Sequence, residues 1–203
     1  MTRAEPRSAL PGADLIDLVV IGGSAGAVRV LGQLAPNLTE RLAPAVVVVV
    51  HMASDARAML PEILRAPGRP PMKQAEDKEP VWPGTVYFAA PGYHLLIEAE
   101  RTFALSLDEP QHFSRPSIDV LFESAADAYG PRLAGVILTG ANTDGASGLR
   151  AIADAGGVTI VQDPKTAAAV TMPQAAREAC PSSHLVDGAE LASWLGSLER
   201  RTP

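Results

Sequence analysis

Short runs of apolar residues alternate along the chain with longer segments whose apolar residues recur every three or four positions. The short runs predict strands and the longer segments predict helices. The expected strands are Asp17–Ile21, Val46–Val50, Val86–Ala89, Val136–Thr139 and Val158–Gln162. The expected helices are Val28–Leu34, Asp55–Leu64, Ser117–Tyr129, Gly145–Ala155, Pro173–Ala179 and Ala189–Leu198. This alternation predicts an α/β fold with a mostly parallel, doubly wound (Rossmann-like) sheet, and the nearly continuous apolar strands indicate helices on both of its faces.

The middle of the chain departs from this alternation. Val86–Ala89, Leu95–Glu98 and Phe103–Leu107 follow one another across short connections that contain Pro91-Gly92 and Glu100-Arg101, which predicts an antiparallel hairpin insertion. The proline-rich, charged stretch before them is expected to be an exposed connection with one short strand near Met72–Ala75. We expect residues 1–14 to be a flexible tail and residues 15–200 to form a single domain.

Composition narrows the class of protein. A chain of 203 residues with 47% hydrophobic and 20% charged residues can bury one full core. The single cysteine, Cys180, cannot form an internal disulfide and is expected to be a packing residue. A net charge of -6 and the lack of a basic, aromatic-rich stripe argue against nucleic acid as a partner. Without a signal-peptide core or an apolar run of about 20 residues, we expect a cytoplasmic protein that does not insert into membranes.

The pentapeptide Gly22-Gly23-Ser24-Ala25-Gly26 follows an apolar strand and precedes a helix. Glycines around a serine at such a turn are typical of a nucleophile elbow, which lifts the hydroxyl into the open and leaves backbone N–H groups at the helix start to hold an oxyanion. Ser24 is therefore a candidate nucleophile. A plain glycine-rich turn, or a nucleotide or phosphate site, is the alternative, although the Walker lysine and the middle glycine of a dinucleotide motif are both absent.

His51 and Asp144 stand just beyond two other expected strands, Val46–Val50 and Val136–Thr139. The carboxyl ends of parallel strands meet at one edge of a sheet, so Ser24, His51 and Asp144 can meet there as nucleophile, general base and orienting carboxylate. Taken singly, such a histidine is more often structural and such an aspartate is more often a helix cap, and only their joint occurrence favours catalysis. Asp163 is a second candidate for the carboxylate, with a turn before Pro164 as its structural alternative.

Other polar residues give weaker signals. Arg115 precedes an expected helix for which Ser117 is a plausible cap; a structural role for Arg115 is favoured, and binding of an acidic substrate in the crevice is the alternative. His94, His112 and His184 lack acid or nucleophile neighbours in the pattern that Ser24, His51 and Asp144 form, and their spacing matches no common metal motif. His94 is expected to be structural. No metal site is predicted.

Several blocks of the sequence occur in the order found in a known family. They are Ile21-Gly22-Gly23-Ser24-Ala25-Gly26, Val50-His51-Met52, Pro83-Gly84-Thr85-Val86-Tyr87, Pro91-Gly92-Tyr93-His94-Leu95, Arg115-Pro116-Ser117-Ile118-Asp119-Val120-Leu121-Phe122, Leu138-Thr139-Gly140, Asp144-Gly145-Ala146, Gln162-Asp163 and Met172-Pro173. From Asp17 to Leu185 the chain thus resembles the catalytic domain of the chemotaxis receptor methylesterases (CheB). The order Ser, His, Asp also separates it from α/β-hydrolases, which run Ser, acid, His.

This resemblance implies a three-layer α/β/α domain that hydrolyses γ-glutamyl methyl esters on the cytoplasmic helices of methyl-accepting chemoreceptors and releases methanol. Ser24, His51 and Asp144 fall at the family's triad positions, and no cofactor is implied. The chain has Ala25 where the family commonly has threonine, and Ala141-Asn142 where it has Met-Gly. Backbone N–H groups at Ala25, Gly26 and Ala141 remain the expected oxyanion donors.

Two other functions stay open at this point: an esterase of the same mechanism with another substrate, and a non-catalytic module that binds a signalling partner. The family's best-known members carry a phosphorylatable receiver domain ahead of the esterase. Only about 16 residues precede the first expected strand here. We therefore expect a stand-alone catalytic domain that is active without a phosphodonor.

Overall fold

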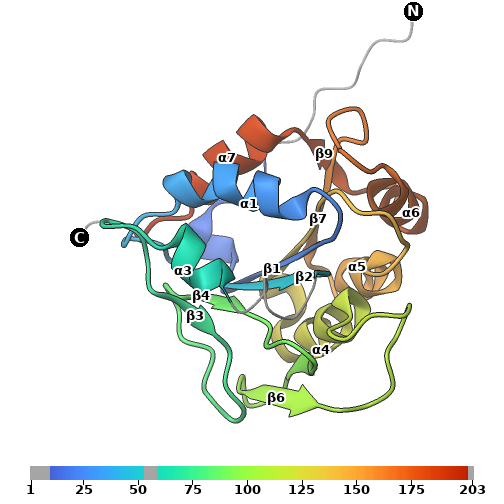
Figure 1. The fold of residues 1–203 in the computed structure, drawn as a ribbon. Coiled ribbons are helices and arrows are strands. Elements are labelled where there is room, and N and C mark those ends of the chain that lie inside the picture. The colour runs from blue at the N-terminus through green and yellow to red at the C-terminus, as the bar shows by residue number, and fades with distance from the viewer. Residues whose placement is uncertain (1–9, 53–58, 201–203) are drawn as a thin grey trace, which may run out of the picture.

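A seven-stranded parallel sheet forms the centre of the computed structural model, which describes residues 10–52 and 59–200 (Figure 1). The strands are β1 (Leu18–Gly23), β2 (Ala45–Val50), β3 (Met72–Gln74), β4 (Val86–Phe88), β7 (Leu133–Ile137), β8 (Val158–Gln162) and β9 (His184–Val186). Their order across the sheet is β3-β4-β2-β1-β7-β8-β9. The chain winds outward from β1 first toward β2 and later toward β7, so the direction of winding reverses at the centre of the sheet. In such sheets the crevice beyond the carboxyl ends of the central strands is the usual site of function.

Helices cover both faces of this sheet. They are α1 (Ala27–Leu34), α3 (Leu60–Leu64), α4 (Ile118–Tyr129), α5 (Ala146–Asp154), α6 (Thr171–Ala179) and α7 (Gly188–Ser197). Buried residues of α1, α3 and α7 pack with Val19 and Ile21 of β1, whereas those of α4, α5 and α6 pack with Leu18 and Val20 on the opposite face. The strands are therefore apolar on both sides, and the expected three-layer α/β/α fold is confirmed.

The expected antiparallel hairpin is present as β5 (His94–Ile97) and β6 (Phe103–Ser106), which pair with each other outside the main sheet. Leu95, Ile97 and Phe103 bury their side chains on the same face as α4. The third run considered for this insertion belongs instead to the main sheet, because β4 is parallel to both β2 and β3. The short strand expected near Met72–Ala75 is β3.

Some boundaries differ from those expected. Strand β7 begins at Leu133, since the buried residues Leu133 and Ala134 extend its ladder with β1. Strand β9 was not expected, because its apolar run, Leu185-Val186, has only two residues. Of the expected helix Asp55–Leu64, residues 55–58 lie outside the described residues and α3 covers only its last five.

Residues 10–14, expected to belong to a flexible tail, lie against the domain instead. Leu10 and Ala13 pack on the core, and the indole N–H of Trp194 in α7 donates to the carbonyl oxygen of Pro11 at 2.9 Å. Cys180 is buried, as expected of a packing residue. Within the described part of the chain, none of the helices combines the length and the apolar character that crossing a bilayer requires.

Candidate active site

Three loops meet at the carboxyl edge of the sheet because its hydrogen-bond ladder continues past the strand ends. The backbone N–H of His51 donates to Gly23 O at 3.0 Å, and that of Ser24 donates to Thr139 O at 2.9 Å. Gly23 pairs with Val50 in the register of β1 and β2. The next residues, Ser24 and His51, are therefore neighbours on adjacent strands, with backbones about 5 Å apart.

Ser24 occupies the sharp turn between β1 and α1. Its carbonyl accepts a hydrogen bond from Ala27 N–H at 2.9 Å, and its side chain is half-buried. Gly26, the N-cap of α1, has φ 86°, a left-handed conformation that glycine adopts at little cost. The glycine thus permits the abrupt reversal that ends the strand and starts the helix at the serine.

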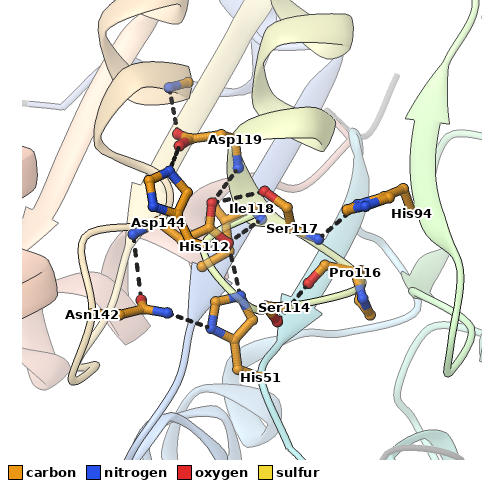
Figure 2. Close-up of polar contacts among 11 residues, drawn as sticks. His51, His94, His112, Ser114, Pro116, Ser117, Ile118, Asp119, Asn142 and Asp144 are labelled. Atoms are coloured by element: carbon orange, nitrogen blue, oxygen red, sulfur yellow. Dashed lines mark hydrogen bonds and ion pairs between the residues drawn. The ribbon is translucent and has the colours of Figure 1, made fainter. Parts of the chain in front are cut away.

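His51 and Asp144 form a buried pair at this edge (Figure 2). Nε2 of His51 lies 2.8 Å from Oδ2 of Asp144, and their side chains are only 10% and 0% exposed. The other ring nitrogen, Nδ1, faces Nδ2 of Asn142 at 3.4 Å, while Oδ1 of Asn142 accepts from Asp144 N–H at 3.3 Å. A carboxylate at Nε2 and an amide donor at Nδ1 favour the tautomer with its proton on Nε2. Nδ1 then carries the lone pair, which faces the amide group of Asn142 in this structure.

Asp144 owes its position to the N-terminus of α4. Its Oδ1 accepts from the Ser117 hydroxyl at 2.8 Å and from Asp119 N–H at 3.0 Å, and its Oδ2 accepts from Ile118 N–H at 2.7 Å as well as from His51. Burial by itself raises the pKa of Asp144, but the bonds from His51, from the two backbone N–H groups and from Ser117 outweigh burial and hold the pKa below its ordinary value. The carboxylate is therefore ionised at neutral pH.

The same contacts correct two expectations about helix caps. Ser117 does occupy the N-cap of α4, but its hydroxyl makes no capping bond and turns to Asp144 instead. The free N–H groups of α4 are capped by Asp144, which arrives from a distant loop. Asp144 also does not cap the helix that follows it, whose N-cap is Gly145.

Asp163, the alternative carboxylate, is engaged in its own turn. Its Oδ1 accepts from Lys165 N–H at 2.9 Å, and its carbonyl accepts from Thr166 N–H at 2.8 Å. Among the described residues it makes no contact with His51, so the geometry favours Asp144. Arg115 likewise has structural contacts: its Nη1 donates to the carbonyl oxygens of Leu107 and Asp108 at 2.8 and 3.0 Å.

The expected oxyanion donors lie around Ser24. Within the described residues, the backbone N–H groups of Ala25, Gly26 and Ala141 donate to no other group, and Ala25 and Ala141 are exposed. Backbone donors without internal partners, at a helix start and in a neighbouring loop, suit a developing negative charge on a substrate oxygen.

Thr139 belongs to the sequence block Leu138-Thr139-Gly140, but no role in the site was expected for it. It is fully buried, and its hydroxyl donates to Ala25 O at 2.8 Å and accepts from Ala169 N–H at 2.8 Å. Its backbone N–H donates to the side chain of Gln162 at 2.9 Å. Thr139 therefore ties the serine turn to the loop that follows β8. In the sequence, the only signal for this role is that Thr139 has a hydroxyl and lies at the end of an expected strand.

The remaining histidines differ from one another. His94 is structural, as expected: it is buried, its Nδ1 accepts from Ser117 N–H at 3.1 Å and its Nε2 donates to Glu109 O at 3.1 Å. His112, for which no partner was expected, lies against Asp119 with Nε2 and Oδ2 3.2 Å apart, and the two form an ion pair when the imidazole is protonated.

The ligand atoms of His112, Asp119 and Asp144 lie within 4.8 Å of one another, which is close enough for a metal ion. Each oxygen of Asp144, however, already accepts two hydrogen bonds. A carboxylate has about four lone-pair positions, so Asp144 has none left for a cation. The cluster suits an ion pair of His112 and Asp119 beside Asp144 better than a metal site.

Comparisons with known proteins point to one family. A family model described as CheB methylesterase matches residues 19–195. A protein of Leptospira interrogans, provisionally named a protein-glutamate methylesterase/protein-glutamine glutaminase, is 43% identical over 184 residues that cover 91% of this chain and 95% of the relative. The protein-glutamate methylesterase/protein-glutamine glutaminase of Symbiobacterium thermophilum is 39% identical over 176 residues, which cover 84% of this chain and 49% of the relative.

The fold is also that of a solved structure. The crystal structure of the Thermotoga maritima CheB methylesterase catalytic domain superposes with a TM-score of 0.85 at 31% identity, covering 90% of this chain and 98% of that domain. This chain spans about half the length of the Symbiobacterium relative and nearly all of the Leptospira relative.

Proposed function

Because the chain belongs to the CheB methylesterase family, we propose that it is a carboxylic ester hydrolase that removes methyl groups from glutamate γ-methyl esters on chemoreceptor-type proteins and releases methanol. The observation that carries this proposal is the buried His51–Asp144 pair at the strand end adjacent to Ser24. A histidine held by an ionised carboxylate, beside a serine on a sharp turn, is the arrangement needed to activate a hydroxyl for acyl transfer.

In the first step, the Ser24 oxygen attacks the ester carbonyl carbon while its proton passes to Nδ1 of His51. Nδ1 takes this role because Nε2 is already committed to Asp144. Proton uptake makes an imidazolium, which the buried charge of Asp144 stabilises. In this ring orientation, Nε2 of His51 binds Asp144 and Nδ1 exchanges protons with Ser24 and the substrate.

The attack places a negative charge on the former carbonyl oxygen. Backbone N–H groups of Ala25, Gly26 and Ala141 are available to bind this oxyanion, and a single such donor is worth about 10²–10³ in rate. When the intermediate collapses, the bond to the methoxy oxygen breaks, and His51 returns its proton to that oxygen, so methanol leaves. A γ-glutamyl ester of Ser24 remains.

Water completes the cycle. His51 takes a proton from a water molecule, the resulting hydroxide attacks the acyl-enzyme, and the proton passes to Ser24 as the bond to its oxygen breaks. The glutamic acid side chain that departs then loses its proton to solvent. Within the site, every proton is exchanged at Nδ1 of His51. No step in this sequence needs a cofactor.

The names of the relatives favour a second activity of the same site, hydrolysis of glutamine side chains on proteins. An amide differs from a methyl ester in its leaving group, which must be protonated before it departs as ammonia. The imidazolium formed at His51 in the first step can supply that proton.

The substrate we propose lies on the cytoplasmic helices of a methyl-accepting chemoreceptor, so we place the protein in the cytoplasm. Ala25 and Ala141 stand where the family commonly has larger side chains, which leaves more room beside Ser24. Another methyl ester is therefore the competing substrate.

Methanol release separates the two possibilities. The purified chain would be given receptor signalling domains methylated at glutamate and, separately, a small γ-methyl glutamate ester. The same domains with glutamine in place of methylated glutamate are the blank, because they carry no methyl ester. Faster methanol release from the methylated receptor than from the small ester at equal ester concentration is the expected result. Equal rates would contradict receptor specificity, and no methanol from either would contradict the esterase.

A further inference from the structure

A second buried carboxylate, that of Asp119, lies next to Asp144. The backbone N–H of Asp119 donates to Asp144, but its side chain turns toward α5 and His112 (Figure 2). The residue is only 3% exposed. A carboxylate so deeply buried beside another is costly unless something stabilises its charge.

One partner of this carboxylate comes from α5. Oδ1 of Asp119 accepts from Gly148 N–H at 2.7 Å. A Cβ atom on residue 148 would lie 2.5 Å from Cβ of Phe122 and 3.1 Å from Cα of Asp119. Glycine is therefore what lets α5 approach α4 closely enough for this bond.

The other partner, His112, arrives on a tight turn. Gln111 and Ser114 exchange backbone hydrogen bonds of 3.1 and 2.8 Å, and the two residues between them, His112 and Phe113, have φ of 49° and 60°. A left-handed conformation costs about 1 kcal/mol or more for a residue other than glycine. The turn holds His112 with Nε2 3.2 Å from Oδ2 of Asp119, and this ion pair offsets part of that cost.

The charge on Asp119 changes near neutral pH. Burial raises its pKa to about 6; the N–H of Gly148 and the His112 side chain act in the opposite direction, while the charges of Asp144 and of Glu123 on α4 raise the pKa further. Protonation of Asp119 therefore falls in the range in which a histidine base also titrates.

We propose that Asp119 and His112 form an outer carboxylate–imidazole pair whose charge, acting through Asp144, sets the basicity of His51. The proposal rests on the function proposed above and makes Asp119 and His112 positioning residues rather than catalytic ones. The structure then contains one chain of alternating imidazole and carboxylate groups: His51, Asp144, Asp119 and His112. Side-chain contacts join His51 to Asp144 and Asp119 to His112, and the backbone N–H of Asp119 donates to the Asp144 carboxylate between them.

The sign of each effect follows from charge. Negative charge near His51 favours its protonated form, and positive charge disfavours it. Asp119→Asn removes a negative charge and leaves His112, so His51 should titrate at a lower pH. His112, when protonated, opposes the charge of Asp119, so His112→Gln should make His51 titrate at a higher pH. Each shift is expected to be on the order of half a pH unit.

The test is an NMR titration of the imidazole signals in the full chain. With four histidines in the sequence, His51 is assignable from single His→Gln variants. Wild type, Asp119→Asn, His112→Gln and the double variant are titrated from pH 5 to 9. Asp127→Asn is the matched control, since it removes the same charge from an exposed position on the same helix and should leave His51 unchanged. The rate of methanol release is measured over the same pH range. The acidic limb of this pH–rate profile should move with the titration of His51.

The outcomes separate this inference from the proposed function. A lower titration of His51 in Asp119→Asn, with no shift in Asp127→Asn, supports the outer pair even if methylated receptor is not hydrolysed. A folded Asp119→Asn variant with unshifted His51 overturns it. If Asp119→Asn does not fold, His112→Gln decides, since it lies on an exposed turn: a His51 titration at the same or a lower pH than in wild type would overturn the proposal, and one at higher pH would support it.

Discussion

Nε2 of His51 lies 2.8 Å from Oδ2 of Asp144, although 93 residues separate the two along the chain. The contact forms because His51 directly follows β2 and Asp144 is held against the N-terminus of α4 by Ser117 and by two backbone N–H groups. The proposed catalytic carboxylate and the cap of α4 are thus one group. Folding of that helix end and alignment of the base depend on the same hydrogen bonds.

Asp144→Asn should lower kcat by about 10²–10⁴-fold, because an amide at this position no longer stabilises the imidazolium. Asp163→Asn is the matched control and should stay within about twofold of wild type, since Asp163 makes its contacts in its own turn. Steady-state methanol release by the two variants is the measurement. A severe loss in Asp163→Asn and none in Asp144→Asn would show that Asp163, and not Asp144, acts with His51.

Asp144 should also make the free energy of unfolding depend on pH in the acidic range. Its pKa is lower in the fold than the unfolded value of 3.8, so its charge stabilises the protein above that value, and this contribution is lost as pH falls through the folded pKa. Asp144→Asn should therefore lower the free energy of unfolding by about 2–4 kcal/mol at pH 7. Urea unfolding at pH 7 and at pH 3 measures this. A difference between variant and wild type that is as large at pH 3 as at pH 7 would contradict the account.

Thr139→Val should slow the enzyme without weakening substrate binding as much. The variant keeps the shape of the side chain but loses the hydroxyl that holds Ala25 O and Ala169 N–H, so the serine turn and its oxyanion donors are less well fixed. We expect kcat to fall about tenfold or more, with a smaller change in KM. Thr139→Ser, which keeps the hydroxyl, should retain most of the activity. Equal rates for the two variants would argue against a positioning role for Thr139.

Asn142→Asp should shift the acidic limb of the pH–rate profile to higher pH. A carboxylate facing Nδ1 of His51 would stabilise the imidazolium, so the free base would be available only at higher pH. Asn142→Gly restores the residue that the family commonly has there and should leave the limb near that of wild type. The measurement is kcat/KM between pH 5 and 9, and an unshifted limb in Asn142→Asp would show that Asn142 does not face the working nitrogen.

The fold was predictable because it depends on local patterns, and continuous apolar runs located β1, β2 and β8. The glycines around Ser24 and the place of His51 directly after β2 made these two residues candidates, and the register of β1 and β2 makes them neighbours. The short strand β9 and the exact start of β7 were not predictable, because Leu185-Val186 and Leu133-Ala134 are apolar runs of only two residues.

The surroundings of Asp144 were not predictable for a different reason. The Ser117 hydroxyl had two possible partners, and only tertiary packing decides between its own helix and Asp144. The ion pair of His112 with Asp119 depends on a turn with two left-handed residues other than glycine, which sequence propensity disfavours. Such features are set by contacts between segments that are distant in the chain or strained locally.

The central claim is that Ser24 attacks the methyl ester, and the most direct test is methanol release from methylated receptor by wild type and Ser24→Ala. Ser147→Ala, which changes an exposed serine on α5, is the matched control. The account predicts a loss of about 10⁴–10⁶-fold in Ser24→Ala with an unchanged melting temperature, and no loss in Ser147→Ala. A stably folded Ser24→Ala protein that releases methanol at the wild-type rate would contradict it.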